Sequence, residues 1–253
     1  MMKLTYRQKI TYACHLYKAI TRTRFKSLIP LLSSHINTHS IVVDVGANAG
    51  YLTKLFSRIA KNGQVISFEP SSYALSILNL VTRCCSLKNV RVIPIGLGSA
   101  PSSLALNIPI KKSGSLGYGL AHINDDRNID ARQTIVEEII IDTLDNMLSK
   151  LSLTKIDFIK LDIEGWELQA LTGARCCIDT WRPVLMIEVN EKYLRRAGDS
   201  TSQLWAFLRE FDYSIFGIED DGTTRLLDGP IPEGDILCIP INARQATLYP
   251  LEK

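Results

Sequence analysis

Short apolar runs alternate with helix-like stretches along most of this chain, and each pair is separated by a polar or glycine-containing turn. Strands are predicted at residues 41–45, 64–69, 90–95, 156–162 and 184–189. Helices are predicted at residues 51–60, 72–83, 166–173 and 202–211. Strands that alternate with helices pair in parallel through right-handed crossovers, so this order predicts a mostly parallel sheet with helices on both faces.

Two segments depart from the alternation. Residues 99–141 hold two apolar stretches around a glycine-rich polar loop, which predicts a hairpin inserted on the sheet edge. Residues 213–218 and 236–239 predict a closing pair of strands, joined by a polar loop that contains residues 220–222.

The first 40 residues form a basic extension, predicted to make one or two helices that cap a domain of residues 41–253. Pro30 should begin or bend the second helix. No acidic residue precedes Asp44, and the cations there are Lys3, Arg7, Lys9, Lys18, Arg22, Arg24 and Lys26. Three interpretations stay open: a cap with solvated cations, peripheral contact of residues 1–26 with an anionic membrane, or contact with an anionic acceptor.

Composition narrows the class of protein. A chain of 253 residues with 46% hydrophobic and 22% charged residues fits one large globular α/β domain. It contains neither a secretory signal nor an apolar run long enough for a transmembrane helix, so a cytoplasmic or membrane-peripheral protein is expected. Its six cysteines form no C-x-x-C pair, and we expect reduced thiols, no metal site and no nucleic-acid partner.

A turn of sequence Gly-Ala-Asn-Ala-Gly, residues 46–50, follows the first predicted strand. Glycines allow a sharp turn and close approach of a ligand, and strand ends of this kind line the ligand crevice of α/β sheets. The turn lacks the second glycine of the nicotinamide motif, and Asp44 lies two residues before it. A carboxylate there suits the ammonium and sulfonium groups of S-adenosylmethionine. The alternative is a structural corner that binds nothing.

Two further strand ends carry acids. Glu69 ends the second predicted strand, where a carboxylate can accept both hydroxyl protons of an adenosine ribose. Asp162 and Glu164 follow a central apolar strand and could hold an acceptor or remove its proton. Alternatively, Glu164 and Glu167 only stabilise the start of the next helix, and Glu69 is only an exposed acid at a strand end.

These motifs together resemble the FkbM family of methyltransferases. The segments that carry the resemblance are VVDVGANAGYLT, FEP, IDTLDNML, FIKLDIEGWELQALTGA and RPVLMIEVN, which together cover residues 41–190. The resemblance implies a class I methyltransferase (Rossmann-like) fold, with a seven-stranded sheet whose last strand is antiparallel. It also implies S-adenosylmethionine as the methyl donor and a hydroxyl group as the usual acceptor.

Residue roles follow from the same resemblance. Asp44, Gly46, Asn48 and Gly50 would surround the methionine part of the donor, Glu69 would hold its ribose, and Asp162 and Glu164 would lie near the transferred methyl group. A base would assist a hydroxyl acceptor, and the candidates are Asp162, Glu164 and Glu188, with His122 as an alternative.

The acceptor itself stays open, because residues 111–132 and the basic extension lie outside the resemblance. A small molecule, a sugar or a lipid is expected. Two other functions compete with methyl transfer: a nicotinamide-dependent oxidoreductase on a Rossmann sheet, and a binding module that has kept the sheet without catalysis. The missing glycine argues against the first, and the presence of both Asp44 and Glu69 against the second.

Overall fold

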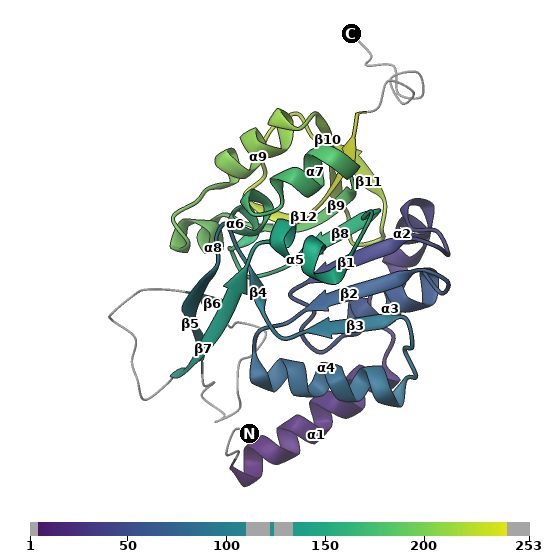
Figure 1. The fold of residues 1–253 in the computed structure, drawn as a ribbon, viewed down its shortest axis with the longest axis vertical. Helices are drawn as coiled ribbons and strands as arrows, with labels where there is room; N and C mark the ends of the chain where they lie inside the picture. Colours follow the sequence, from purple (N-terminus) through teal and green to yellow (C-terminus); the bar gives the residue numbers. More distant parts are fainter. Residues whose placement is uncertain (1–4, 110–121, 124–133, 242–253) are drawn as a thin grey trace.

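The fold is built on one twisted sheet of eight strands (Figure 1). The computed structural model describes residues 5–109, 122–123 and 134–241. In spatial order the strands are β11 (Thr224–Leu226), β10 (Tyr213–Ile218), β12 (Glu233–Pro240), β9 (Val184–Asn190), β8 (Phe158–Leu161), β1 (Ile41–Val45), β2 (Gln64–Phe68) and β3 (Val90–Ile93). The strands from β9 to β3 are parallel, whereas β12 is antiparallel to both of its neighbours. The mostly parallel sheet with an antiparallel last strand is therefore confirmed.

Register fixes where the strands end. Val45 of β1 pairs with Phe68 of β2 and with Leu161 of β8, and Leu161 pairs with Ile187 of β9. The next residues in these four strands are Gly46, Glu69, Asp162 and Glu188. Because parallel strands point the same way, all four residues emerge at one edge of the sheet.

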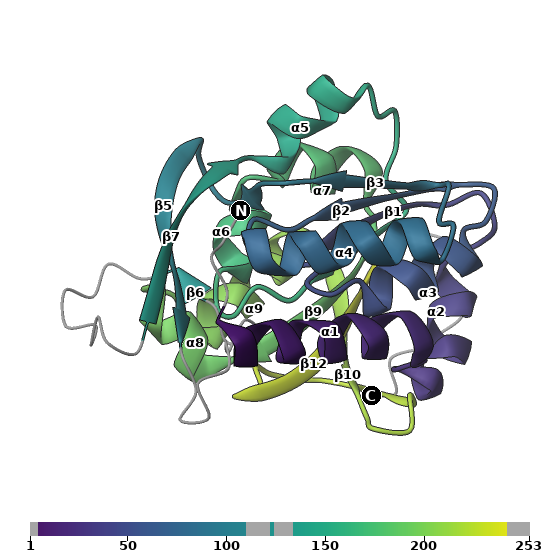
Figure 2. The same cartoon turned by 90° about the horizontal axis from the view of Figure 1, so that it is seen from below.

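Helices cover both faces of the sheet (Figures 1 and 2). They are α1 (Tyr6–Thr21), α2 (Ile29–His35), α3 (Tyr51–Ile59), α4 (Ser72–Cys84), α5 (Leu144–Leu151), α6 (Glu167–Thr172), α7 (Arg175–Trp181), α8 (Glu191–Arg196) and α9 (Thr201–Glu210). One core contains buried residues of α5, α6, α7 and α9, and a second contains those of α2 and α3. The sheet therefore lies between two apolar layers and is held rigidly on both sides.

The insertion after β3 forms a sheet of its own, which corrects the prediction of a hairpin on the edge of the main sheet. Its strands are β4 (Gly96–Leu97), β7 (Thr134–Asp142), β5 (Ser102–Pro109) and β6 (His122–Ile123), in that spatial order. The predicted pairing itself is present, since β5 and β7 are antiparallel. The sheet stays separate because Ile108, Ile139 and Ile141 are buried in a third core, which also contains Tyr73 and Ile77 of α4.

The strand count also differs from the prediction of seven. Strand β11 adds an eighth, antiparallel to β10, and every residue of β11 is exposed. An exposed edge strand buries no apolar face, so its sequence carries no alternating pattern to reveal it.

A buried lysine fixes helix α1 to the domain. Lys54 of α3 donates from Nζ to the carbonyl oxygens of Ala19, Ile20 and Arg22, at 2.6, 3.0 and 3.0 Å. These carbonyls lie at the end of α1, where backbone acceptors lack intrahelical partners and a cation is favoured. Helix α1 is therefore a docked part of the fold. Among the described helices, none has both the length and the apolar character needed to cross a membrane.

Candidate functional site

The turn after β1 lies directly against the turn after β8. Gly46 has φ +74°, and a Cβ atom there would lie 2.0 Å from the carbonyl oxygen of Asp162. Only glycine allows this approach without moving backbone. The Gly46 and Ala47 amides both donate to the carbonyl oxygen of Phe68, which also ties the turn to β2.

Glu69 is held in place by two backbone amides. Its Oε2 accepts from the Asn48 amide at 2.7 Å and its Oε1 from the Ser71 amide at 2.9 Å. Burial raises the pKa of Glu69 to about 7, although both backbone contacts oppose this shift. Each oxygen retains a free lone pair for a ligand, so the carboxylate is held in place without being fully saturated.

Behind the turn lies a buried network of charges. Thr53 Oγ1 donates to Asp44 Oδ2 at 2.6 Å. Lys160 Nζ lies 3.8 Å from Asp44 Oδ1 and 3.1 Å from Asp162 Oδ2. Lys160 also donates to the carbonyl oxygen of Gly46 at 3.2 Å. A charged side chain as deeply buried as Lys160 requires such partners, so the network fixes β1 and β8 relative to one another.

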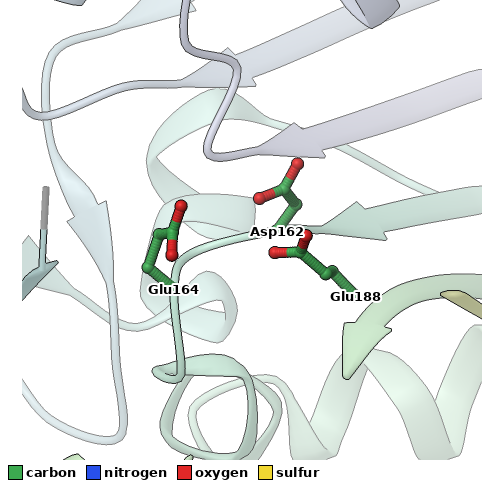
Figure 3. A group of neighbouring side chains, drawn as sticks. All are labelled: Asp162, Glu164 and Glu188. Carbon is green, nitrogen blue, oxygen red and sulfur yellow. The ribbon is translucent and has the colours of Figure 1, made fainter. Parts of the chain in front are cut away.

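Three carboxylates meet at the ends of β8 and β9 (Figure 3). Asp162, Glu164 and Glu188 each contribute an oxygen, and these oxygens lie within 4.8 Å of one another. Burial, followed by the negative charge of Asp162, raises the pKa of Glu164 to about 7 and that of Glu188 to about 8. Carboxylates this close either share protons or hold a cation. The absence of a metal stays a prediction.

The loop after Asp162 is shaped by Glu167. Its Oε1 accepts from the amides of Ile163 and Gly165, at 3.0 and 3.1 Å. Glu164 has a left-handed backbone with φ +57°, and its carbonyl oxygen accepts from Arg196 Nη2 at 2.9 Å. Glu167 therefore holds the loop that presents Glu164, a structural role different from the stabilisation of the helix start considered for it.

A pocket opens at this edge of the sheet, with an empty volume of about 670 Å³ including its mouth. The described residues that line it are Val45, Gly46, Asn48, Phe68, Glu69, Pro70, Ser71, Gly96, Leu97, Leu106, Ile123, Ile139, Ile141, Asp162, Ile163, Glu164 and Trp166. Three of these are acidic and none is basic, so the pocket favours ligands with positive charge.

Five of the eight residues predicted from the sequence line the pocket: Gly46, Asn48, Glu69, Asp162 and Glu164. Asp44 lies behind them in the Lys160 network, and Gly50 begins α3 against Leu78. Glu188 belongs to the carboxylate group but does not line the pocket. The side chain of His122 and most of residues 111–132 lie outside the described part of the chain.

Sequence reasoning missed other residues of the site. Leu106, Ile139 and Ile141 form an apolar wall contributed by the second sheet. The Ser71 hydroxyl and the Trp166 indole N–H are buried at the pocket with no hydrogen-bond partner among the described residues. The Ser71 side chain makes no capping bond to α4, and the Glu137 carboxylate accepts from the Ser72 amide instead. The only sign of this charge network in the sequence was a lysine, Lys160, inside the otherwise apolar run FIKL.

The order of the strands and the position of the site are those of a class I methyltransferase fold. A parallel sheet ends in an antiparallel pair, a glycine turn follows β1, and a buried acid follows β2. A crystal structure of an FkbM methyltransferase from Methylobacillus flagellatus KT is similar, with a TM-score of 0.52 and 17% sequence identity. That match covers 90% of this chain and 59% of the other.

Sequence comparisons identify the family. The model of the methyltransferase FkbM domain matches residues 44–215, and the chain belongs to the FkbM methyltransferase family. Methyltransferase 1 of Beauveria bassiana (strain ARSEF 2860) is 26% identical over 144 residues, which are 53% of this chain and 58% of that protein. Methyltransferase sdnD of Sordaria araneosa is 22% identical over 187 residues, 59% of this chain and 70% of that protein. The chain thus spans little more than half the length of the first of these relatives.

The buried acids predict how stability depends on pH. Burial raises the pKa of Glu167 to about 7, above its value in an unfolded chain, so folding favours the protonated form. This contribution is complete below about pH 4.5 and is lost as pH rises through 7. We expect the free energy of unfolding to fall by a few kcal/mol between pH 5.5 and pH 8.5, since one pKa unit corresponds to about 1.4 kcal/mol.

Urea unfolding of the ligand-free protein at several pH values measures this slope. Glu167→Gln keeps an oxygen for both amides, so it should flatten the slope without unfolding the protein. The exposed Glu233→Gln serves as the control and should keep the wild-type slope. Equal slopes for Glu167→Gln and the wild type would remove Glu167 from this account.

Proposed function

We propose that this protein transfers a methyl group from S-adenosylmethionine to a hydroxyl group of a small-molecule, sugar or lipid acceptor. The observation that carries the proposal is the placement of Glu69. Its buried carboxylate lies at the end of β2, oriented by two backbone amides, and it faces the same pocket as the turn after β1. Family membership supports the same reaction class.

The polar atoms of the pocket fit the donor. Glu69 can accept from the two ribose hydroxyls, because each of its oxygens makes one described contact and can accept another. The buried Ser71 hydroxyl and Trp166 N–H lack partners among the described residues and would gain them from a polar ligand. The apolar wall of Leu106, Ile139 and Ile141 offers a surface for an adenine ring.

Charge favours this donor over a nicotinamide dinucleotide. Glu69, Asp162 and Glu164 line the pocket, and no lysine or arginine joins them among the described lining residues. A pyrophosphate would be repelled by these carboxylates, whereas a cationic sulfonium and an ammonium group would be attracted. The pocket therefore supports the methyl donor and argues against the oxidoreductase alternative.

The bound donor would supply an activated methyl group on a sulfonium, so the residues of this chain have three tasks. They align the acceptor oxygen, accept its proton and exclude water. Asp162 and Glu164 line the pocket, and Glu188 lies beside them as a further proton acceptor. A pKa of about 7 places Glu164 near the value that suits a general base at neutral pH. A binding module without catalysis would not need such a group of acids.

Glu69→Ala should weaken binding of S-adenosylmethionine. Loss of a charge-assisted contact to the ribose should cost about 2 kcal/mol, or roughly 30-fold in affinity. Isothermal titration calorimetry with S-adenosylhomocysteine measures the effect, and thermal unfolding checks that the variant is folded. Glu137→Ala is the matched control, because Glu137 binds the Ser72 amide without lining the pocket. Unchanged affinity in folded Glu69→Ala would exclude Glu69 from the donor site.

Asp162→Asn should keep the fold and lower turnover by about 100-fold, because the variant loses a proton acceptor at the pocket. Lys160 retains Asp44 and the Gly46 carbonyl oxygen as partners, which protects the fold. The acceptor is first identified by comparing metabolite extracts with and without the protein for the mass gain of one methyl substitution. Glu188→Gln should have the smaller effect on turnover, since Glu188 does not line the pocket. Wild-type turnover in Asp162→Asn would give Asp162 a structural role alone.

A further inference from the structure

Helix α1 has two apolar faces, and only one of them packs on the domain. On the inner face, the Tyr12 ring meets the Tyr73 ring edge-on at 5.4 Å, and Ser76 Oγ donates to the Tyr12 hydroxyl at 3.1 Å. Ala19 is fully buried, and Leu16 packs against the same core. These contacts place the inner face on α4.

The outer face is apolar as well. Tyr6, Ile10 and Tyr17 are exposed by 80%, 51% and 68% of their surfaces. The intervals of four and seven positions between them bring all three to one stripe of a helix with 3.6 residues per turn. A helix that only capped the domain would present polar residues on this side, so the stripe requires another explanation.

Cations surround this stripe. Lys9 and Lys18 on α1, and Arg22, Arg24 and Lys26 after it, are all exposed. None of them takes part in an ion pair between described residues. The turn that contains Asp220, Asp221 and Gly222 approaches Ser27, so acidic residues lie just beyond Lys26.

We propose that this surface, residues 6–26, docks on an anionic membrane. Exposed apolar and tyrosine side chains can enter the interface between headgroups and acyl chains, while lysines and arginines bind the anionic headgroups. A second copy of the chain fits less well, because pairing two such faces would bring like charges together. A nucleic acid would use the cations but would leave Ile10 without an apolar partner.

The docked surface would lie near the pocket. Tyr12 and His15 of α1 contact Tyr73, in the first turn of α4, and α4 begins just after Glu69. The amino-terminal half of α1 therefore lies at the carboxyl edge of the main sheet, the edge that carries the pocket (Figures 1 and 2). Docking would bring that edge close to the lipid headgroups.

The test uses the full chain with substitutions on the surface. Removal of α1 is unsuitable, because it would leave the buried Lys54 without its three carbonyl acceptors. Co-sedimentation with vesicles is measured at low salt, with phosphatidylcholine alone and mixed with phosphatidylserine. The variants are Ile10→Ser and the double variant Lys9→Glu/Lys18→Glu. The control, Lys61→Glu/Lys88→Glu, makes the same change in net charge at exposed positions elsewhere.

We expect the wild type to bind only vesicles that contain phosphatidylserine. Lys9→Glu/Lys18→Glu should lower the vesicle affinity by roughly 20-fold or more, since each cation near an anionic membrane raises the affinity several-fold. Ile10→Ser should also weaken binding, and the control should bind like the wild type. Failure of the wild type to bind overturns the proposal, as does equal loss in the control. A dimer that dissociates in Ile10→Ser, found by analytical ultracentrifugation without vesicle binding, would assign the face to self-association instead.

Discussion

Lys160 is a cation in a strand that is otherwise apolar, and its burial is tolerated because the ends of β1 and β8 surround it with acceptors. Its ammonium lies 3.1 Å from Asp162, 3.8 Å from Asp44, and 3.2 Å from the carbonyl oxygen of Gly46. Removal of Lys160 itself would leave the buried Asp44 carboxylate without a compensating cation, so Lys160 is the member on which the others depend. The same network sets the distance between the turn after β1 and the group of carboxylates after β8.

In this arrangement the positive charge and most of the negative charge lie on different sides of the pocket wall. The compensating cation lies behind the pocket wall, and the acids Glu69, Asp162 and Glu164 face the pocket itself. When these acids are ionised, they attract a cationic ligand and repel an anionic one. Glu164 and Asn48 have left-handed backbones at this site, and Glu167 and Arg196 hold the loop that contains Glu164 in place. The second sheet adds an apolar wall of Leu106, Ile139 and Ile141 to one side of the pocket.

The parallel order of strands and the acids at their ends could be predicted because both follow from local pattern. A short apolar run that ends in a glycine turn or an acid predicts a strand end, and parallel pairing brings strand ends to one edge. Asp162, Glu164 and Glu188 meet for that reason.

Features that depend on contacts between distant parts of the chain could not be predicted. Strands β5 and β7 form a separate sheet because they pack against α4. Every residue of strand β11 is exposed, so its sequence shows no alternation of apolar and polar residues. The two apolar faces of α1 could be told apart only once its inner face was placed against Tyr73.

The central proposal is that the pocket at the carboxyl edge binds the S-adenosyl nucleoside shared by a methyl donor and its product, and not a dinucleotide. Titration of the wild-type protein with S-adenosylhomocysteine and, separately, with NADH tests this claim most directly, with calorimetry as the readout. The account predicts saturable binding of S-adenosylhomocysteine at one site and no heat of binding with NADH. Saturable binding of NADH without binding of S-adenosylhomocysteine would contradict it.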